Sequence, residues 1–445
     1  MKILFLYVNN CNGLSIPIGL SYLIAILKQQ NHEVFLFDTS FSVFDYSEFN
    51  ISGKIGDDGW GIINEYRKRV EKIDPNLIAV SCASLQLNFA VKMIESLENR
   101  RTTIFGGVGP TVDYQDLIRK KIVDFICVGY GEKCLPKLMD NLDNQTDLSN
   151  IPNLVYKQDG KVRINKFSQK ADLEDLPLPD WSLFSKRHLT RIFKHQIKRW
   201  GNFQLTRGCP FNCTYCVNYF YHKKLGMRVQ RFPFEKIIEE MKTLSQKYNL
   251  EIIRIFDECF GFGKIDYYQK FGKLYKQIMN LPTIIATRPE AITPELIGVL
   301  KDIDCISVSV GIEVGNENQR KQILNRNVSN HIIERAFKLL HEAGIRSSSY
   351  NMMGFPDDTR ELIFETIKLN QKCKPDFINA FIFCPEPQTE LREYCKKHRL
   401  LETEGLVDYV RRSVIKNEKL SKAELWKIFR SFENHIRQPI QQKQE

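Results

Sequence analysis

Short apolar segments alternate with amphipathic segments along most of this chain, and the alternation occurs in two separate series. In the first series, strands are expected over 2–8, 33–38, 77–82, 102–107 and 124–129. The segments between these strands carry apolar residues at helical spacing. Five consecutive βα units predict a doubly wound parallel α/β sheet, and such sheets bind ligands at the carboxyl ends of their strands.

A second series starts near residue 203 and predicts six more strands. Pro233, Thr293 and Ser329 mark helix starts within it, because each is a favourable cap or first-turn residue. Six parallel βα units predict a partial (βα)6 barrel with its functional residues at the C-terminal ends of the strands. The expected strands are 203–207, 252–257, 283–288, 304–312, 346–353 and 377–383.

The rest of the chain connects or extends these units. Two prolines in Asp175–Trp181 predict an extended linker path with Trp181 as its apolar anchor, and the basic run Lys194–Arg199 is expected to be exposed. Lys422–Ile436 predicts an amphipathic helix, and the polar end Gln441–Glu445 is expected to be disordered. The expected boundaries are a first domain over 1–145, a linker over 146–198, a barrel domain over 199–399 and a C-terminal helical extension over 400–445.

Composition narrows the class of protein. A hydrophobic fraction of 43% in 445 residues suits globular domains, and the opening run Ile3–Val8 is too short for a membrane span or a signal peptide core. The net charge is +11, but the 64 lysines and arginines are dispersed among 53 acidic residues, which favours a solvated surface over nucleic-acid binding. Twelve cysteines without a secretory signal indicate a reducing compartment, so a cytoplasmic protein is expected.

Three of the cysteines, Cys209, Cys213 and Cys216, form a C-x3-C-x2-C loop. Thiolates at this spacing can hold three irons of a 4Fe-4S cluster and leave the fourth iron open to a small molecule. The alternatives are a zinc site or inert buried thiols, but zinc uses four ligands, usually in two separated pairs. Three further cysteines recur every eleven residues, at Cys373, Cys384 and Cys395. This spacing is too wide for a cluster loop, so a second cluster is not expected.

The string Leu205–Cys216 resembles the loop by which radical S-adenosylmethionine (SAM) enzymes hold their cluster. The resemblance implies that the open iron binds SAM and that the cluster splits it to give a 5'-deoxyadenosyl radical. Tyr215 matches the aromatic position that the family places near the adenine. The SAM contacts implied at the strand ends are Asp257, Glu258, Arg288, Glu313, Asn351 and Gly354, with Arg228 and Arg231 as further candidates. Asp257 could instead cap a helix, and Arg288 could be an ordinary salt-bridge partner.

The first unit resembles the flavodoxin-like, cobalamin-binding domain that precedes the barrel in one large subgroup of this family. The D-x-H-x-x-G motif is missing and His32 is the only histidine before residue 188, so a histidine ligand to cobalt is not expected. The alternative is a sheet retained only as scaffold. The resemblance includes the first helix opening Pro17–Leu20, and Asn9–Gly13 lies at the end of the first strand. The cobalamin contacts implied are Ser81, Ser84, Gly106, Gly107, Gly129, Gly131 and Glu132.

Together these resemblances imply a cobalamin-dependent radical SAM enzyme, most simply a methyltransferase acting on an unactivated carbon of a small molecule or peptide. A 4Fe-4S cluster, SAM and cobalamin would be its cofactors, and a flavodoxin or ferredoxin would supply electrons. Gln388 replaces the glycine usual in the family's proline-rich loop, which leaves the substrate open. Two alternatives remain: a cyclase or rearrangement enzyme that uses the same cofactors without methyl transfer, and a non-catalytic protein that binds them.

Overall fold

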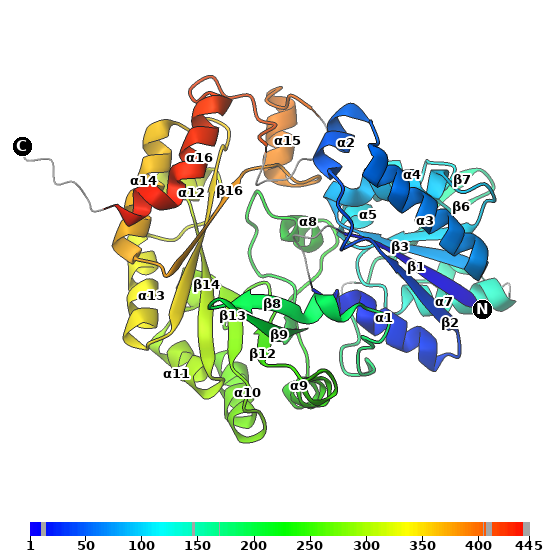
Figure 1. Ribbon diagram of the computed structural model, residues 1–445, viewed down its shortest axis with the longest axis horizontal. Helices are drawn as coiled ribbons and strands as arrows, with labels where there is room; N and C mark the ends of the chain where they lie inside the picture. The colour runs from blue at the N-terminus through cyan, green and yellow to red at the C-terminus, as the bar shows by residue number, and fades with distance from the viewer. Residues whose placement is uncertain (10–14, 145–146, 169, 404, 406–411, 439–445) are drawn as a thin grey trace, which may run out of the picture.

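Two α/β units lie beside each other in the computed structural model (Figure 1). The structure describes residues 1–445 except 10–14, 145–146, 169, 404, 406–411 and 439–445, so the expectation for Gln441–Glu445 lies outside the described residues. No helix in the described ranges is both long and apolar enough to cross a membrane.

The first unit contains a seven-stranded sheet in the order β2-β1-β3-β4-β5-β6-β7. Strands β1 to β5 are parallel and confirm the five strands expected from the sequence, while β6 and β7 add an antiparallel edge. Residues Ile3 to Leu6 of β1 are buried because helices cover both faces of the sheet. The strands are β1 (Lys2–Val8), β2 (Glu33–Asp38), β3 (Leu77–Cys82), β4 (Thr102–Gly106), β5 (Phe125–Cys127), β6 (Leu154–Gln158) and β7 (Lys161–Ile164).

Helices α1 and α7 lie on one face of this sheet, and α3 and α4 lie on the other (Figure 1). The helices and short turns of the unit are α1 (Ile18–Gln29), α2 (Tyr46–Ser52), α3 (Asp57–Ile73), η2 (Ser84–Gln86), α4 (Leu87–Glu95), α5 (Val108–Val112), α6 (Tyr114–Leu117), α7 (Cys134–Asn144) and η3 (Leu148–Asn150).

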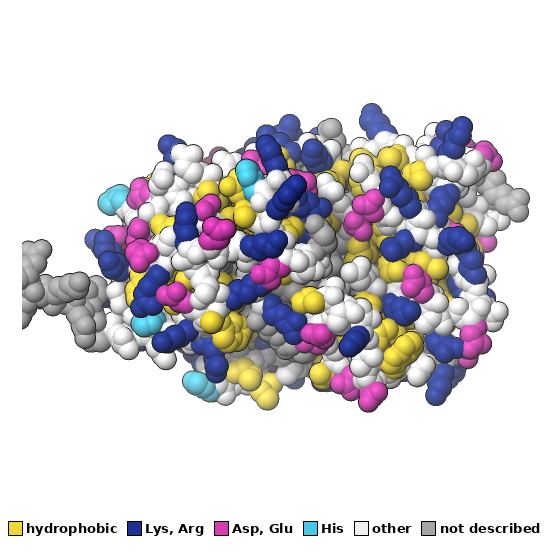
Figure 2. All heavy atoms as spheres, turned by 90° about the horizontal axis from the view of Figure 1, so that it is seen from above, with side chains coloured by type: hydrophobic (Ala, Val, Ile, Leu, Met, Phe, Trp, Pro, Cys, Tyr) yellow, Lys and Arg dark blue, Asp and Glu magenta, His cyan; other side chains and the backbone are white. Residues whose placement is uncertain are grey.

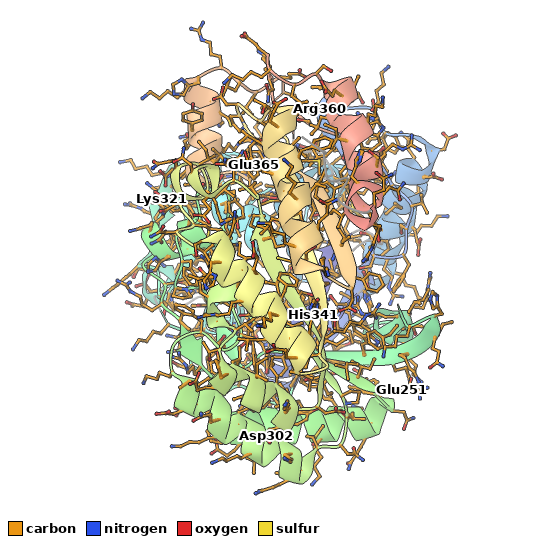
Figure 3. All side chains as sticks on the ribbon, turned by 90° about the vertical axis from the view of Figure 1, so that its left-hand side faces the viewer. Glu251, Asp302, Lys321, His341, Arg360 and Glu365 are labelled. Carbon is orange, nitrogen blue, oxygen red and sulfur yellow. The ribbon has the colours of Figure 1, made fainter. Side chains whose placement is uncertain are left out.

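The second unit contains a curled sheet in the order β16-β15-β14-β13-β12-β9-β8. Its six strands from β9 to β16 are parallel and form the expected partial barrel, with the helices on the outside (Figure 3). The strands are β8 (Thr190–Phe193), β9 (Gln196–Phe203), β12 (Ile252–Ile255), β13 (Thr283–Thr287), β14 (Cys305–Glu313), β15 (Arg346–Met353) and β16 (Phe377–Ile382).

The prediction that the first barrel strand spans 203–207 is wrong. The strand is β9, which ends at Phe203 and pairs with β12 over Trp200–Phe203. The next residues leave the sheet because the backbone N–H groups of Leu205 and Thr206 donate to the carboxylate of Asp257. Thr206–Arg207 (β10) then pairs with Gln230–Arg231 (β11) in a separate antiparallel ribbon.

The helices of the second unit begin where the sequence indicates. Pro233 precedes α9, and the side chains of Thr293 and Ser329 accept a backbone N–H at the starts of α11 and α13. The helices and short turns are η4 (Lys186–Leu189), α8 (Asn218–Lys223), α9 (Phe234–Tyr248), α10 (Ile265–Ile278), η5 (Pro289–Ala291), α11 (Pro294–Asp302), α12 (Glu317–Gln322), α13 (Asn330–Glu342), α14 (Arg360–Cys373), α15 (Glu390–Lys397) and α16 (Lys422–Arg437).

The segment expected as a linker carries several strands. It contributes β6 and β7 to the first sheet and β8 to the second, and the basic run Lys194–Arg199 lies in the β8–β9 hairpin. Trp181 is buried against Phe203 and Tyr248, as an apolar anchor should be. The amphipathic helix expected at the C-terminal extension is α16, which packs its apolar side on α14 and β16 of the barrel.

Candidate functional site

A cavity of about 620 Å³ lies between the two units, at the carboxyl ends of the strands of both sheets. This volume suits a small-molecule or cofactor site. The cavity joins the strand ends of the first sheet to the cysteine loop of the second unit, because Cys209 is part of its wall. The residues predicted from sequence that line it are Ser81, Gly106, Gly107, Gly129, Gly131, Glu132, Cys209 and Glu258.

Three of the lining glycines have backbone conformations that other residues rarely adopt. Gly107 has φ +92°, Gly129 has φ +83° and Gly208 has φ +88°. A Cβ on Gly107 would lie 2.9 Å from the carbonyl oxygen of Cys82, so this turn needs glycine. The strand ends therefore present bare backbone to the cavity. Ser84 is buried in η2 and is not among the lining residues.

Each sulfur of the cysteine loop has at least one N–H donor. The backbone N–H of Phe211 donates to Cys209, the backbone and side chain of Asn218 both donate to Cys216, and the Arg288 guanidinium donates to Cys213 over 3.3 Å. Such donors are typical of iron–sulfur sites. Among the described residues, no three His, Cys, Asp or Glu side chains converge tightly enough to hold a single metal ion.

Burial makes these thiols weak acids. It raises the pKa of Cys209 to about 12 and that of Cys216 to about 11. Metal ligation requires the thiolate, so a cluster bound here must displace protons from the loop. Of the cysteines spaced eleven residues apart, Cys373 packs in the main core and Cys395 in a separate cluster that includes Leu391 of α15.

Asp257 and Glu258 follow β12 but point to different places. The carboxylate of Asp257 accepts from the N–H groups of Leu205 and Thr206 at 2.8 and 3.0 Å, and from the Thr206 hydroxyl at 2.8 Å. Burial raises the pKa of Asp257 to about 7. Glu258 instead lines the cavity, where the residue is exposed and its carboxylate accepts from the backbone N–H of Gly208; desolvation by the surrounding protein raises its pKa. Asp257 therefore shapes the entry to the cysteine loop, and Glu258 is the carboxylate that faces the cavity.

Glu313 ends β14 and forms a buried ion pair with Arg326. Arg326 donates to the Glu313 carboxylate over 2.8 Å, to the Tyr215 hydroxyl over 3.2 Å and to the carbonyl of Gly311 over 2.8 Å. Burial raises the pKa of Tyr215, so its phenol is neutral. The sequence gives no sign of Arg326, because its loop between α12 and α13 carries no recognisable motif.

The fifth-strand motif places its two predicted residues differently. Gly354 has φ +84°, and its N–H donates to Asp358 over 2.7 Å. The side-chain amide of Asn351 is engaged by Asn370 on α14 at 2.7 Å and donates to the carbonyl of Asn379. Any contact of Asn351 with a ligand in the barrel would therefore use its backbone.

The predicted arginines are engaged with protein groups. Besides Cys213, Arg288 contacts Glu290 and the Phe211 ring. Arg228 approaches Nε2 of His222 at 2.8 Å, and Arg231 lies over the Tyr267 ring. Neither Arg228 nor Arg231 is among the residues that line the cavity.

A buried salt bridge joins the two motifs across the cavity wall. Nη1 of Arg207, two residues before Cys209, lies 2.5 Å from Oε1 of Glu132, and both side chains are less than 10% exposed. Sequence reasoning gave Arg207 no role, although a charged residue in the run Leu205–Arg207 is itself unusual. The strand-end loop of the first sheet is thereby fixed to the cluster loop.

Sequence comparisons agree with this two-part site. The Radical SAM superfamily profile matches residues 203–369, and the B12 binding domain profile matches residues 6–139. The chain therefore carries a Radical SAM domain and a B12-binding domain. These two domains imply a 4Fe-4S cluster, SAM and cobalamin as cofactors, and the donors at the three sulfurs and the glycine-lined cavity fit them.

Similar proteins include a methyltransferase and a cyclase. Over 393 residues the chain is 24% identical to an uncharacterized methyltransferase of Pyrococcus horikoshii, covering 87% of this chain and 80% of that protein. Over 338 residues it is 22% identical to the anaerobic magnesium-protoporphyrin IX monomethyl ester cyclase of Rubrivivax gelatinosus, covering 74% and 60% of the two chains.

Among solved structures, the radical SAM methyltransferase TsrM from Kitasatospora setae, with cobalamin and a [4Fe-4S] cluster bound, has a TM-score of 0.70. The match is 16% identical and covers 94% of this chain and 83% of that one. At this identity, the similarity establishes the shared two-unit fold.

Proposed function

We propose that this radical SAM protein is a cobalamin-dependent methyltransferase acting on an unactivated carbon of a small molecule or peptide. The observation that carries the proposal is the single cavity with Gly106, Gly107 and Gly129 on one wall and Cys209 on the other. A methyl carrier and a radical source must both reach one substrate, and this cavity gives both access to the same space. Similarity to methyltransferases supports the proposal.

When bound, the cluster and SAM supply a radical, and cobalamin carries the methyl group. The protein's own residues hold these groups, orient them and exclude water. Cys209, Cys213 and Cys216 hold the cluster, while Glu258 offers its carboxylate to the amino group of SAM. Arg326 fixes Glu313 and the Tyr215 ring at the barrel mouth.

The cavity wall is mainly apolar, which keeps water from a reactive carbon. We assign the cobalamin site to domain 1–145 and the SAM site to domain 199–399, joined by 146–198 and covered by 400–445. Within the first domain, the backbones of Gly129 and Gly131, with Ser81, would lie against the cobalamin.

A second candidate function is a cyclisation or rearrangement with the same cofactors but without methyl transfer. Similarity to the cyclase of Rubrivivax gelatinosus favours it as the alternative. A protein that binds the cofactors without turnover is the third possibility.

Product analysis separates these functions. Protein reconstituted anaerobically with iron, sulfide and cobalamin would be given SAM, reductant and candidate substrates. A methyltransferase should form S-adenosylhomocysteine and 5'-deoxyadenosine together. Deoxyadenosine alone would favour rearrangement, and failure to retain cobalamin would contradict the proposal. A Cys213→Ala variant is the matched control, because it removes a cluster ligand and leaves Gly107 and Gly129 intact.

We also propose a flavodoxin or ferredoxin as the electron donor and the cytoplasm as the location. Lysine and arginine side chains are interspersed with acidic ones on the face shown in Figure 2, so an electron donor would meet a mixed surface there.

A further inference from the structure

The three sulfurs of the cysteine loop differ in the kind of donor they meet. Backbone N–H groups serve Cys209 and Cys216, and each of these donors is neutral. Cys213 instead meets the guanidinium of Arg288, whose Nη1 lies 3.3 Å from Sγ. A cation therefore reaches one of the three thiolates at hydrogen-bond distance.

Arg288 is held in this position from two sides. It follows β13, and its Nε and Nη2 donate to Oε1 of Glu290 at 3.1 and 2.5 Å. Its guanidinium lies 3.6 Å from the centroid of the Phe211 ring, which belongs to the cysteine loop itself. Arg288 is only 8% exposed. Because these contacts fix the side chain, its Nη1 has little freedom to leave the sulfur.

Charge and hydrogen bonding at a cluster sulfur change the energy of adding an electron. Reduction adds negative charge to the cluster and its thiolates, and a buried cation beside a thiolate stabilises that charge more than the same cation would in water. Hydrogen bonds to the sulfurs are among the factors that set the potential of an iron–sulfur cluster. The negative charge of Glu290 acts in the opposite direction, from the far side of the guanidinium.

We propose that Arg288 is a positioning residue that raises the reduction potential of the cluster through Cys213 Sγ, with Glu290 moderating the effect. The inference rests on the proposed function only in requiring that Cys209, Cys213 and Cys216 hold a cluster. It assigns Arg288 to the cluster rather than to SAM. A purely structural salt bridge would change stability but would have no particular sign of effect on the potential.

The test is a redox titration of the full-length protein, reconstituted with the cluster alone and followed by electron paramagnetic resonance. For Arg288→Gln we expect the ratio of reduced to oxidised cluster at a fixed potential to fall about tenfold, which corresponds to about 59 mV for one electron. In Arg288→Lys this ratio should fall less, because lysine keeps the positive charge. Glu290→Gln should shift the ratio in the opposite direction, because the opposing charge is removed.

The matched control is Arg360→Gln, which removes an equal charge from an exposed ion pair on the outer helix α14 (Figure 3). It should leave the midpoint unchanged. An unchanged midpoint in Arg288→Gln, or shifts of the same sign in Arg288→Gln and Glu290→Gln, would overturn the inference. If Arg288→Gln does not retain iron, Glu290→Gln decides, and a midpoint that fails to rise would refute it.

These measurements need neither SAM nor cobalamin. A protein that shows the expected shifts but no methyl transfer would contradict only the proposed function. A methyltransferase without the shifts would contradict only the role of Arg288.

Discussion

Three carboxylates near the cysteine loop have different roles, although all three lie at the carboxyl ends of barrel strands. Asp257 accepts three hydrogen bonds from Leu205 and Thr206, and Glu313 is paired with Arg326. Glu258 faces the cavity. Position at a strand end therefore identified the right region, but only the structure separates the buried carboxylates of Asp257 and Glu313 from that of Glu258, which lines the cavity.

Isosteric replacement of Asp257 and of Glu258 should therefore have different consequences. Asp257→Asn replaces an acceptor of the Thr206 hydroxyl with a donor, so we expect a loss of about 1–3 kcal/mol in the free energy of unfolding, with less iron bound. Glu258→Gln should leave stability and iron content unchanged but weaken SAM binding. Urea unfolding, iron analysis and equilibrium SAM binding measure these effects. Normal SAM affinity in Glu258→Gln would refute its assignment.

At the scale of elements, apolar periodicity predicted the strands well because a parallel sheet buries both faces of each strand. The first barrel strand was misplaced because Phe203 to Thr206 continues the β pattern in sequence, whereas a distant carboxylate draws Leu205 and Thr206 out of the sheet. Polar residues on both faces of β15 likewise concealed that Asn351 faces α14. Arg326 could not be predicted, since its ion pair joins segments that no local pattern connects.

Helix α16 supports the glycine turn after β15. A Cβ on Gly354 would lie 2.9 Å from Cδ2 of Leu425, so the helix packs directly on this turn. Phe432 is also buried in the cluster between α14 and α16. The C-terminal helix is therefore part of the wall behind the proposed SAM site.

Truncating the buried side of α16 should destabilise the barrel. We expect Leu425→Ala to lower the free energy of unfolding by about 2–5 kcal/mol, because it leaves a cavity beside Gly354. Trp426→Ala is the control on the same helix, since Trp426 is 37% exposed and its removal should cost much less. Denaturant unfolding measures both. Equal losses in the two variants would show that Leu425 has no special packing role.

At the scale of the whole molecule, polar contacts hold the two units around the cavity. Arg207 pairs with Glu132, Lys28 with Asp180, and the Tyr22 hydroxyl donates to Glu240 over 2.8 Å. The first and third of these contacts are buried, and the second is partly exposed. None was predicted from sequence, because each depends on how two separately folded units face each other.

The exposure of these pairs predicts how much each contributes. Glu132→Gln leaves Arg207 without its buried counter-charge, so we expect a loss of about 3–5 kcal/mol in unfolding free energy and poorer retention of cobalamin. Lys28→Gln breaks a partly exposed pair between the first unit and Asp180 of the connecting segment, and it should cost at most about 1 kcal/mol. Unfolding and cobalt analysis after gel filtration measure these effects. Similar costs for the two variants would contradict the proposed role of the buried pair.

Glu240 makes the junction between the units sensitive to pH. Burial raises its pKa from 4.5 to about 7, an effect that the Tyr22 hydroxyl, Lys236 and Arg207 only partly oppose. The folded protein thus binds a proton that the unfolded chain releases between these values. Stability from this group is present below pH 4.5 and is lost as the pH rises towards 7, by at most about 3 kcal/mol.

Glu240→Gln removes this titration and remains neutral at every pH. Compared with wild type, it should therefore have similar stability at pH 5 and greater stability at pH 8, because only the wild type must then bury a carboxylate. Urea unfolding across this range tests the difference, with Glu71→Gln as the control because Glu71 is exposed on α3. A constant difference between Glu240→Gln and wild type across the range would mean that Glu240 does not titrate in this window. Protonation of Glu240 would then contribute nothing to the stability of the junction beside the cavity.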